Sequence, residues 1–215
     1  MRRLLILSIA AMLAVVGCTP ADPVRFFALT PIDAPPSGDD SDLAIGVLPI
    51  GLASYLDRSG IVIRTRPNEL AISSLHNWIE PLDTQARRVV ARNLGLLLGT
   101  DQVFLLPEQR LMAMDYAVEI AIERFEIVAG PEVVLASGVA ALSAAAAEAP
   151  SEEVVLEARW TLFEGDERTV LRTAPSRRVV LVGSPPTFEQ RIAAMSEALA
   201  GLSRSIATEI AARRQ

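Results

Sequence analysis

The chain has 215 residues, 51% of them hydrophobic, and 20 basic residues stand against 26 acidic ones, a formal net charge of −6. This acidic balance argues against nucleic-acid binding, which needs clustered positive charge, and against a polybasic mode of membrane binding. The sequence contains no lysine, which excludes Schiff-base and P-loop lysine chemistry. Its length and apolar content fit one domain with a substantial core.

The N-terminus has the composition of an export signal. Two arginines precede an apolar run from Leu4 to Val16, which ends in Gly17-Cys18. The run is well short of the roughly 20 residues that span a bilayer. It resembles a bacterial lipoprotein signal, which implies that residues 1–17 are removed and that Cys18 carries lipid, palmitate included. The alternative is a free buried cysteine; as the only cysteine, Cys18 has no disulfide partner.

The residues that follow Cys18 limit where the domain can lie. Residues 18–24 form a short tether, which reaches about 20 Å at roughly 3.4 Å per residue. The folded domain, predicted to span residues 25–215, is therefore expected close to its membrane. Loss of the two signal arginines leaves 18 arginines against 26 acidic residues, a net charge of −8. In bacterial lipoproteins an aspartate after the cysteine tends to retain the protein in the inner membrane, so Thr19 implies the periplasmic face of the outer membrane.

Short strands and one helix are predicted in the first half of the domain. The helix has apolar residues at spacings of three and four from Ala86 to Leu98. Asp83 or Thr84 is expected to cap its start, and Gly99 is expected to end it. Loops rich in turn-forming residues separate the predicted strands, which are Arg25–Leu29, Leu43–Ile50, Ile61–Arg66 and, after the helix, Gln102–Leu106.

The second half is predicted to form mainly antiparallel strands. From Tyr116 to Ile127 the apolar period is two, and a change of parity predicts a β-bulge near Arg124. A turn at Gly130–Glu132 is expected to lead into a hairpin partner, Val133–Leu142. The further predicted strands are Val154–Phe163 and the pair Thr169–Arg172 and Arg177–Val182, the last two as one strand or a broken pair.

A long helix closes the chain. Thr187 and Gln190 match a capping box. An apolar stripe follows at spacings of three and four: Ile192, Met195, Leu199, Leu202, Ile206 and Ile210. The stripe either packs against the sheet or forms a groove or helix contact for a partner. Together the elements predict an α/β fold, a single domain with a mixed, largely antiparallel sheet packed by two main helices.

The residues needed for catalysis are largely missing from the sequence. His76 is the only histidine, and there is no Gly-x-Ser-x-Gly turn and no glycine-rich phosphate loop. We therefore expect a protein that is not an enzyme and that holds no cofactor and no metal. His76 lies two residues before Trp78, and it is either a hydrogen-bonded structural histidine or a pH-sensing or partner-contacting one.

Several segments of the first half match one family. They are Arg25–Leu29 soon after the cysteine, Ile45–Ile50, Tyr55–Arg58 before Ile61–Arg64, Leu75–Leu82, and Arg92–Leu94 in the helix. On these segments the chain resembles the auxiliary lipoproteins of ABC-type transport systems, the paraquat-inducible protein C (PqiC) family. The resemblance covers mainly residues 18–106. The second half matches in the order of its elements and in its closing helix.

The resemblance implies a non-enzymatic outer-membrane lipoprotein that works with an MCE-domain protein and an ABC permease to move phospholipid between the membranes. Its task would be docking. Tyr55, Leu56, Asp57 and Arg58 then form a partner-facing loop, because aromatic and arginine side chains are favoured interface anchors. In the alternative, Tyr55 and Leu56 pack inward, and Asp57 and Arg58 form a local salt bridge.

Two hypotheses of other classes remain open. One is a periplasmic lipid-binding carrier that holds acyl chains between the sheet and the C-terminal helix, and the other is a structural lipoprotein that braces the envelope. A carrier needs an unfilled apolar cavity, whereas a docking module has a packed core and an exposed apolar patch. The sequence also allows a homo-oligomer.

Overall fold

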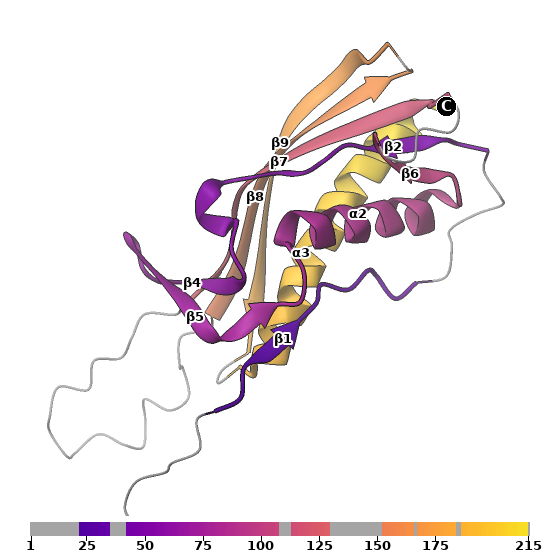
Figure 1. The fold of residues 1–215 in the computed structure, drawn as a ribbon. Helices are drawn as coiled ribbons and strands as arrows, with labels where there is room; N and C mark the ends of the chain where they lie inside the picture. The colour runs from indigo at the N-terminus through magenta and orange to yellow at the C-terminus, as the bar shows by residue number, and fades with distance from the viewer. Residues whose placement is uncertain are drawn as a thin grey trace, which may run out of the picture.

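The computed structural model describes residues 22–34, 42–107, 113–129, 152–165, 167–183 and 186–214. The signal segment, Cys18 and the predicted strand Val133–Leu142 lie outside these residues. Within them the chain forms one mixed sheet and two long helices, which confirms the predicted α/β fold (Figure 1). The two helices, α2 (Leu82–Leu98) and α3 (Phe188–Ala212), pack against each other and against the sheet.

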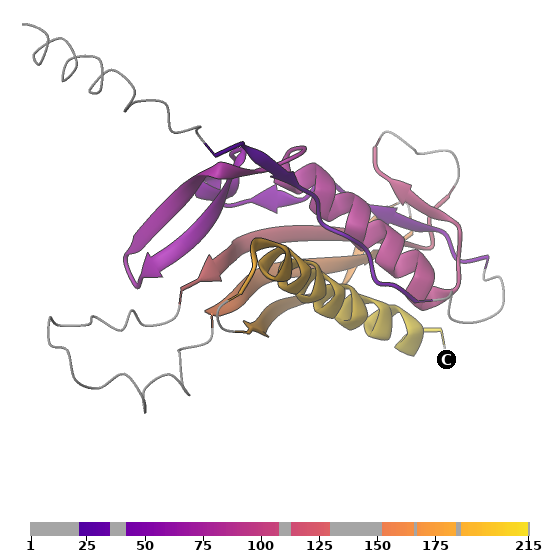
Figure 2. The ribbon, with the colours of Figure 1, turned by 90° about the horizontal axis from the view of Figure 1, so that it is seen from below.

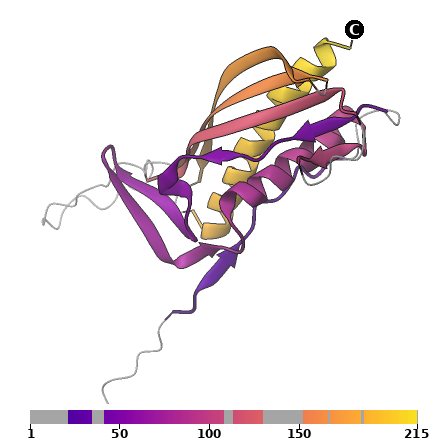
Figure 3. The same ribbon diagram turned by 45° about the horizontal axis from the view of Figure 1, so that its top comes forward.

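The described part of the sheet has nine strands, and the central one is β7 (Tyr116–Val128). The others are β1 (Arg25–Phe27), β2 (Ile45–Val47), β3 (Gly51–Leu52), β4 (Gly60–Arg66), β5 (Glu69–Trp78), β6 (Val103–Leu105), β8 (Glu152–Glu164) and β9 (Thr169–Val182). The order β1-β5-β4-β7-β2-β6 makes up one part of the sheet, and β8 and β9 extend it from β7. The sheet curls around the helices (Figure 3).

Strand β7 is paired along both edges. One edge pairs antiparallel with β8 over its whole length, and the other pairs in parallel with β2, β3 and β4 in turn. A register shift between Ile122 and Arg124 confirms the predicted β-bulge. Among the described strands, the antiparallel neighbour of β7 is β8.

Strand β5 has no counterpart in the sequence prediction. It forms a hairpin with β4, but the register is broken between them, since Gly60 pairs with Asn77 and Val62 pairs with Ile72. Five of the ten residues of β5 are exposed and only Trp78 is buried, so the strand lacks the alternation that marks a half-buried strand. Glycine is required at residue 60, because a Cβ there would lie 2.5 Å from Ile72 Cγ2 and 2.6 Å from the backbone oxygen of Ser73.

Strand β9 is one continuous strand of 14 residues, which decides between the two alternatives that the sequence left open. Among the described strands it pairs with β8 alone, so it lies at an edge of the sheet. A proline is tolerated at an edge, where its missing N–H breaks no ladder of hydrogen bonds, and Pro175 lies within β9 for this reason.

Helix α3 forms as predicted. Gln190 N donates a hydrogen bond to Thr187 Oγ1 at 3.3 Å, and Thr187 N donates one to Gln190 Oε1 at 2.8 Å, which completes the capping box. Every residue of its apolar stripe is at most 6% exposed. The stripe is therefore core packing and not a groove for a partner. In the part of the chain described here, no helix combines the length and hydropathy that a membrane span requires.

Helix α2 begins differently from the prediction and ends as predicted. Its N-cap is Pro81, and neither Asp83 nor Thr84 caps it, because both lie inside the first turn. There Asp83 interacts favourably with the helix dipole. The helix ends at Gly99 with φ 63° and ψ 42°, a left-handed conformation that favours glycine.

The burial of the α3 stripe predicts a large loss of stability when it is truncated. Leu199 is fully buried, so Leu199→Ala is expected to lower the free energy of unfolding by about 2–5 kcal/mol. Glu197 is exposed on the same helix, and Glu197→Ala is the matched control, expected within about 0.5 kcal/mol of wild type. Urea denaturation measures both, and equal stabilities of the two variants would contradict the assignment of the stripe to the core.

Candidate functional site

The four residues predicted to contact a partner lie in and just after a single turn of 3₁₀ helix, η1 (Ser54–Leu56). Strand β3 leads into this turn, and Ala53 N donates a hydrogen bond to the backbone oxygen of Ile122 in β7 at 2.9 Å. Leu56 of this turn is buried in the core that the sheet forms with the helices. The site is therefore positioned by β7.

The structure separates the four residues into two pairs. Leu56 is 1% exposed and belongs to the core, and the ring of Tyr55 is half-buried against it. Asp57 and Arg58 are exposed, and within the described residues no ion pair joins them. The inward alternative thus holds for Tyr55 and Leu56, whereas the local salt bridge does not form. Asp57 and Arg58 are the members available to a partner.

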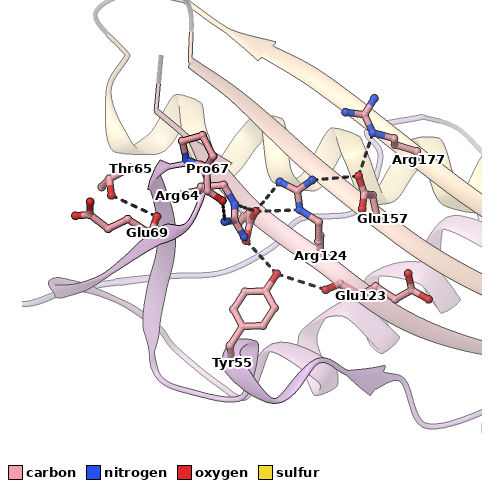
Figure 4. A network of polar contacts seen from close by, with 10 residues as sticks. Tyr55, Arg64, Thr65, Pro67, Glu69, Glu123, Arg124, Glu157 and Arg177 are labelled. Carbon is pink, nitrogen blue, oxygen red and sulfur yellow. Dashed lines mark hydrogen bonds and ion pairs between the residues drawn. The ribbon is translucent and has the colours of Figure 1, made fainter. Parts of the chain in front are cut away.

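A buried carboxylate holds η1 on the sheet. Glu126 is fully buried in β7, and the Tyr55 hydroxyl donates a hydrogen bond to its Oε2 at 3.0 Å (Figure 4). Arg64 donates from Nε at 2.5 Å and from Nη2 at 3.2 Å, and Arg124 donates from Nε at 3.0 Å and from Nη2 at 2.7 Å. The network therefore joins η1, β4 and β7 through one side chain.

The network reaches β8 and β9 through a second carboxylate. Arg124 Nη1 donates to Glu157 Oε1 at 3.2 Å, and Arg177 Nε donates to the same oxygen at 3.1 Å (Figure 4). The β-bulge makes this arrangement possible, because it turns both Arg124 and Glu126 to the outer face while Phe125 stays in the core. Without the shift of parity, Glu126 would point towards the helices.

The charges of the network shift the pKa values of its members. Burial raises the pKa of Glu126, but the hydrogen bonds from Arg64, Arg124 and Tyr55 outweigh burial and hold the pKa below its usual value. Burial, with the adjacent Glu126 carboxylate, raises the pKa of Tyr55 to about 12. Near neutral pH Glu126 is thus ionised and Tyr55 is a neutral phenol.

A shallow cleft of about 310 Å³ adjoins the two exposed residues. Asp57, Arg58 and Ser59 line one side of it, and Trp78 to Pro81 line the other. Within this cleft Ile79 is 56% exposed, and Glu80 forms an ion pair with Arg88 at 2.8 Å. The structure therefore joins two segments, Tyr55–Arg58 and Leu75–Leu82, that the sequence analysis treated separately. Residues 79 and 80 could not be assigned to the site from sequence, because the unpredicted strand β5 brings them there.

His76 lies on the inner face of the sheet, away from this cleft. Its ring stacks on Phe188 with the centroids 3.7 Å apart and the planes 5° apart, and Nδ1 lies 2.9 Å from Ser73 Oγ. Burial, with the positive charges of Arg25 and Arg191, lowers the pKa of His76 below its usual value. The contacts with Phe188 and Ser73 favour the structural interpretation of this histidine. Among the described residues, no three His, Cys, Asp or Glu side chains are grouped so as to hold a metal ion.

The described residues form a packed α/β domain with exposed residues beside η1. The family model for the ABC-type transport auxiliary lipoprotein component matches residues 27–150, so the chain belongs to this family of lipoproteins, whose members are membrane-anchored. The family assignment confirms the resemblance found in the sequence. No curated protein matches the chain.

Two solved structures share the fold. One is an uncharacterised protein with a TM-score of 0.64 and 17% identity, which covers 88% of this chain and 99% of its own. The other is a protein from Xanthomonas campestris with a TM-score of 0.66 and 17% identity, which covers 86% of this chain and 93% of its own. At this identity the likeness concerns the fold alone.

The ionic network predicts a pH-dependent contribution to stability. Glu126→Gln leaves two partly buried guanidinium groups without their carboxylate, and breaking such a pair costs about 3–5 kcal/mol. The pKa of Glu126 is lower in the folded chain than its usual value of 4.5. The contribution of ionised Glu126 to the free energy of unfolding is therefore complete above pH 4.5 and is lost as the pH falls through the folded pKa.

The difference in unfolding free energy between wild type and Glu126→Gln is therefore expected at pH 7 and should shrink below pH 4.5. The matched control is Glu123→Gln. Glu123 lies on the same strand, but it is largely exposed, and its ion pair with Arg159 is longer, at 3.7 Å. Denaturant unfolding across this pH range measures both variants. A difference for Glu126→Gln that does not change with pH would contradict the role of the ionised carboxylate.

Proposed function

We propose that this lipoprotein docks onto an MCE-domain protein of an ABC-linked phospholipid transport system, at the periplasmic face of the outer membrane. Membership of the auxiliary lipoprotein family supports a role in ABC-type transport. The observation that carries the docking proposal is an exposed apolar face, made by Phe26, Ile72 and Ile79, that adjoins Asp57 and Arg58. We call these five residues the docking face.

Two apolar residues of the docking face lie side by side on β1 and at the end of β5. Phe26 is 59% exposed and pairs in register with Asn77, and Ile79 follows Asn77 by two residues. Ile79 N donates to the backbone oxygen of Phe27 at 3.0 Å, which keeps the two strands together at this point. By the alternation of strands, Phe26 and Ile79 share the outer face.

Ile72 extends this apolar surface across the hairpin. It is 51% exposed, and its Cγ2 lies directly over Gly60, which pairs with Asn77. Because residue 60 has no side chain, Ile72 lies close to the row formed by Gly60, Asn77 and Phe26. The three exposed apolar residues thus lie on one face of the sheet, and exposed apolar patches mark interaction sites.

The docking face lies close to the point where the lipid is attached. Only three residues separate Cys18 from Asp22, the first described residue, and β1 begins at Arg25. At roughly 3.4 Å per residue, Cys18 lies within about 14 Å of Asp22. A partner that extends across the periplasm to the outer membrane would meet the domain on this side.

The interior supports docking over the carrier hypothesis. Met195, Leu199 and Leu202 of α3 are at most 1% exposed, so side chains fill the apolar space between α3 and the sheet. A cleft of about 440 Å³ does occur between α2, β6 and the segment Leu29–Pro31. It lies at the surface, with Arg88 and Arg92 among its lining residues, and not where acyl chains were expected.

The proposal predicts which exposed residues matter. Arg58→Ala combined with Ile79→Ser is expected to weaken binding to the MCE partner by about 2 kcal/mol or more, roughly thirtyfold, with an unchanged thermal midpoint. The matched control is Val179→Ser with Leu181→Ser, which removes two exposed apolar residues from β9 instead. Tyr55→Ala is a poor test, because it also removes a hydrogen bond to Glu126.

Surface plasmon resonance with the purified MCE protein measures the affinities, and flotation with phosphatidylethanolamine vesicles shows whether the face contacts a bilayer instead. Loss of affinity in the β9 control but not in the docking-face variant would overturn the assignment. The assignment would also be overturned if the docking-face variant bound the MCE protein normally and lost only its flotation with vesicles.

Lipidation at Cys18 is a separate prediction, and it follows from the signal that ends in Gly17-Cys18. Cys18→Ser is expected to leave the protein unprocessed or soluble, because no acceptor thiol remains. Metabolic labelling with palmitate and separation of inner from outer membranes measure both lipidation and location. Absence of label in the wild type would contradict the prediction for Cys18, and label in the inner membrane would contradict the location.

A further inference from the structure

We propose that the cleft between β9 and the C-terminal half of α3 binds a phosphate group. The cleft has a volume of about 520 Å³. The α3 residues that line it lie in the half of the helix that leads to the C-terminus, which is marked C in Figure 2. Its polar lining comes from Arg172, Ser176, Arg177 and Arg178 of β9 and from Ser205, Thr208 and Glu209 of α3. Arg177 is paired with Glu157. Trp160 of β8 also lines the cleft and is 4% exposed.

Arg178 is the central cation of this cleft. Its Nη2 donates a hydrogen bond to Ser205 Oγ, and among the described residues no carboxylate forms an ion pair with it. Its Nε is buried and has no hydrogen-bond partner. A buried donor without a partner is costly and rare, so this N–H group is suited to an acceptor that enters the cleft.

A second donor of the same kind lies close by. Ser176 is 8% exposed, lines the cleft, and its Oγ has no partner within the described structure. Gly201 on α3 allows the helix to approach this part of β9, because a Cβ there would lie 3.0 Å from Arg178 Cδ. The Arg178 side chain is partly buried at this close approach, and it lines the cleft.

The charge of the cleft favours an anion. Its one carboxylate, Glu209, is shared between Arg172 at 2.9 Å and Arg213 at 2.7 Å, which leaves the charge of Arg178 without compensation. This is an uncompensated positive site in a chain of formal net charge −6. The Arg178 Nε–H group and the Ser176 hydroxyl have no partner within the described structure, and both can donate a hydrogen bond. A ligand that accepts hydrogen bonds therefore suits the cleft.

A phosphate group meets these requirements, because its oxygens accept several hydrogen bonds and match the planar fork of a guanidinium. The phosphate could belong to a phospholipid headgroup or be free phosphate. The phospholipid source rests on the proposed role in lipid transport, whereas binding of phosphate as such does not.

The test is calorimetric titration of the full-length protein in detergent with two probes, inorganic phosphate and dihexanoyl phosphatidylglycerol below its micelle concentration. Wild type is expected to bind at least one of them, and Arg178→Gln is expected to weaken that binding at least about tenfold. Ser176→Ala should weaken it by a smaller factor. The matched control is Arg159→Gln, an exposed arginine on the opposite side of the sheet, which should bind as wild type does.

Binding of both probes with equal affinity would assign the site to phosphate itself, and binding of the lipid alone would assign it to a headgroup. Binding of neither probe, or equal binding by wild type and Arg178→Gln, would overturn the site. Equal losses in Arg178→Gln and Arg159→Gln would also overturn it, because they would indicate nonspecific charge attraction. Thermal denaturation confirms that each variant is folded.

The outcome is independent of partner docking. Arg178 lies on β9 and Arg58 lies after η1, so Arg178→Gln should retain affinity for the MCE protein and Arg58→Ala should retain phosphate binding. If the protein binds no phosphate, Arg58→Ala is still expected to weaken binding to the MCE protein. If the protein does not dock onto the MCE protein, Arg178→Gln is still expected to weaken phosphate binding.

Discussion

The pairing of β7 along both edges is the constraint on which the rest of this domain depends. β8 and then β9 extend the sheet from one edge, and the short strands of the first half pair with the other. The bulge between Ile122 and Arg124 then changes which side chains face outward. Glu126 consequently points away from the helices, where it accepts hydrogen bonds from η1, β4 and β7 itself.

This arrangement separates packing from recognition. The inner face of the sheet is closed by α2 and α3, whose apolar residues form a continuous core. On the outer face, Glu126 fixes Tyr55, so Asp57 and Arg58 emerge at a defined place beside Ile79. A buried carboxylate that is ionised and fully hydrogen-bonded adds little net stability but specifies one geometry, which is the property that a docking surface needs.

Much of the fold could be predicted from local patterns, because its large elements are amphipathic. The stripe of α3, its capping box and the bulge at Arg124 all follow from the spacing of apolar residues. Strand β5 could not be predicted, since only one of its ten residues is buried and its register with β4 is broken between Gly60 and Val62. Pairing of β8 with β7 depends on contacts distant in sequence, which spacing does not encode.

The candidate site was predictable only in part for the same reason. The turn at Tyr55–Arg58 could be found by its residue types, but the inward position of Leu56 and the role of Tyr55 depend on Glu126, which is 71 residues away from Tyr55. Ile79 joins the site because the end of β5 pairs beside Gly60, where Trp78 N donates a hydrogen bond to the backbone oxygen of Ser59. Ser176 and Arg178 gave no signal at all, since their burial depends on packing against α3, where Gly201 lies close to Arg178.

The central claim is that the outer face beside η1 is the docking surface. Site-specific photocrosslinking in intact envelopes tests it most directly, with the crosslinker placed at residue 58 or 79 and, for comparison, at residue 181 on β9. We expect positions 58 and 79 to capture the MCE protein and position 181 to capture none. Capture from position 181, with none from positions 58 and 79, would contradict the account.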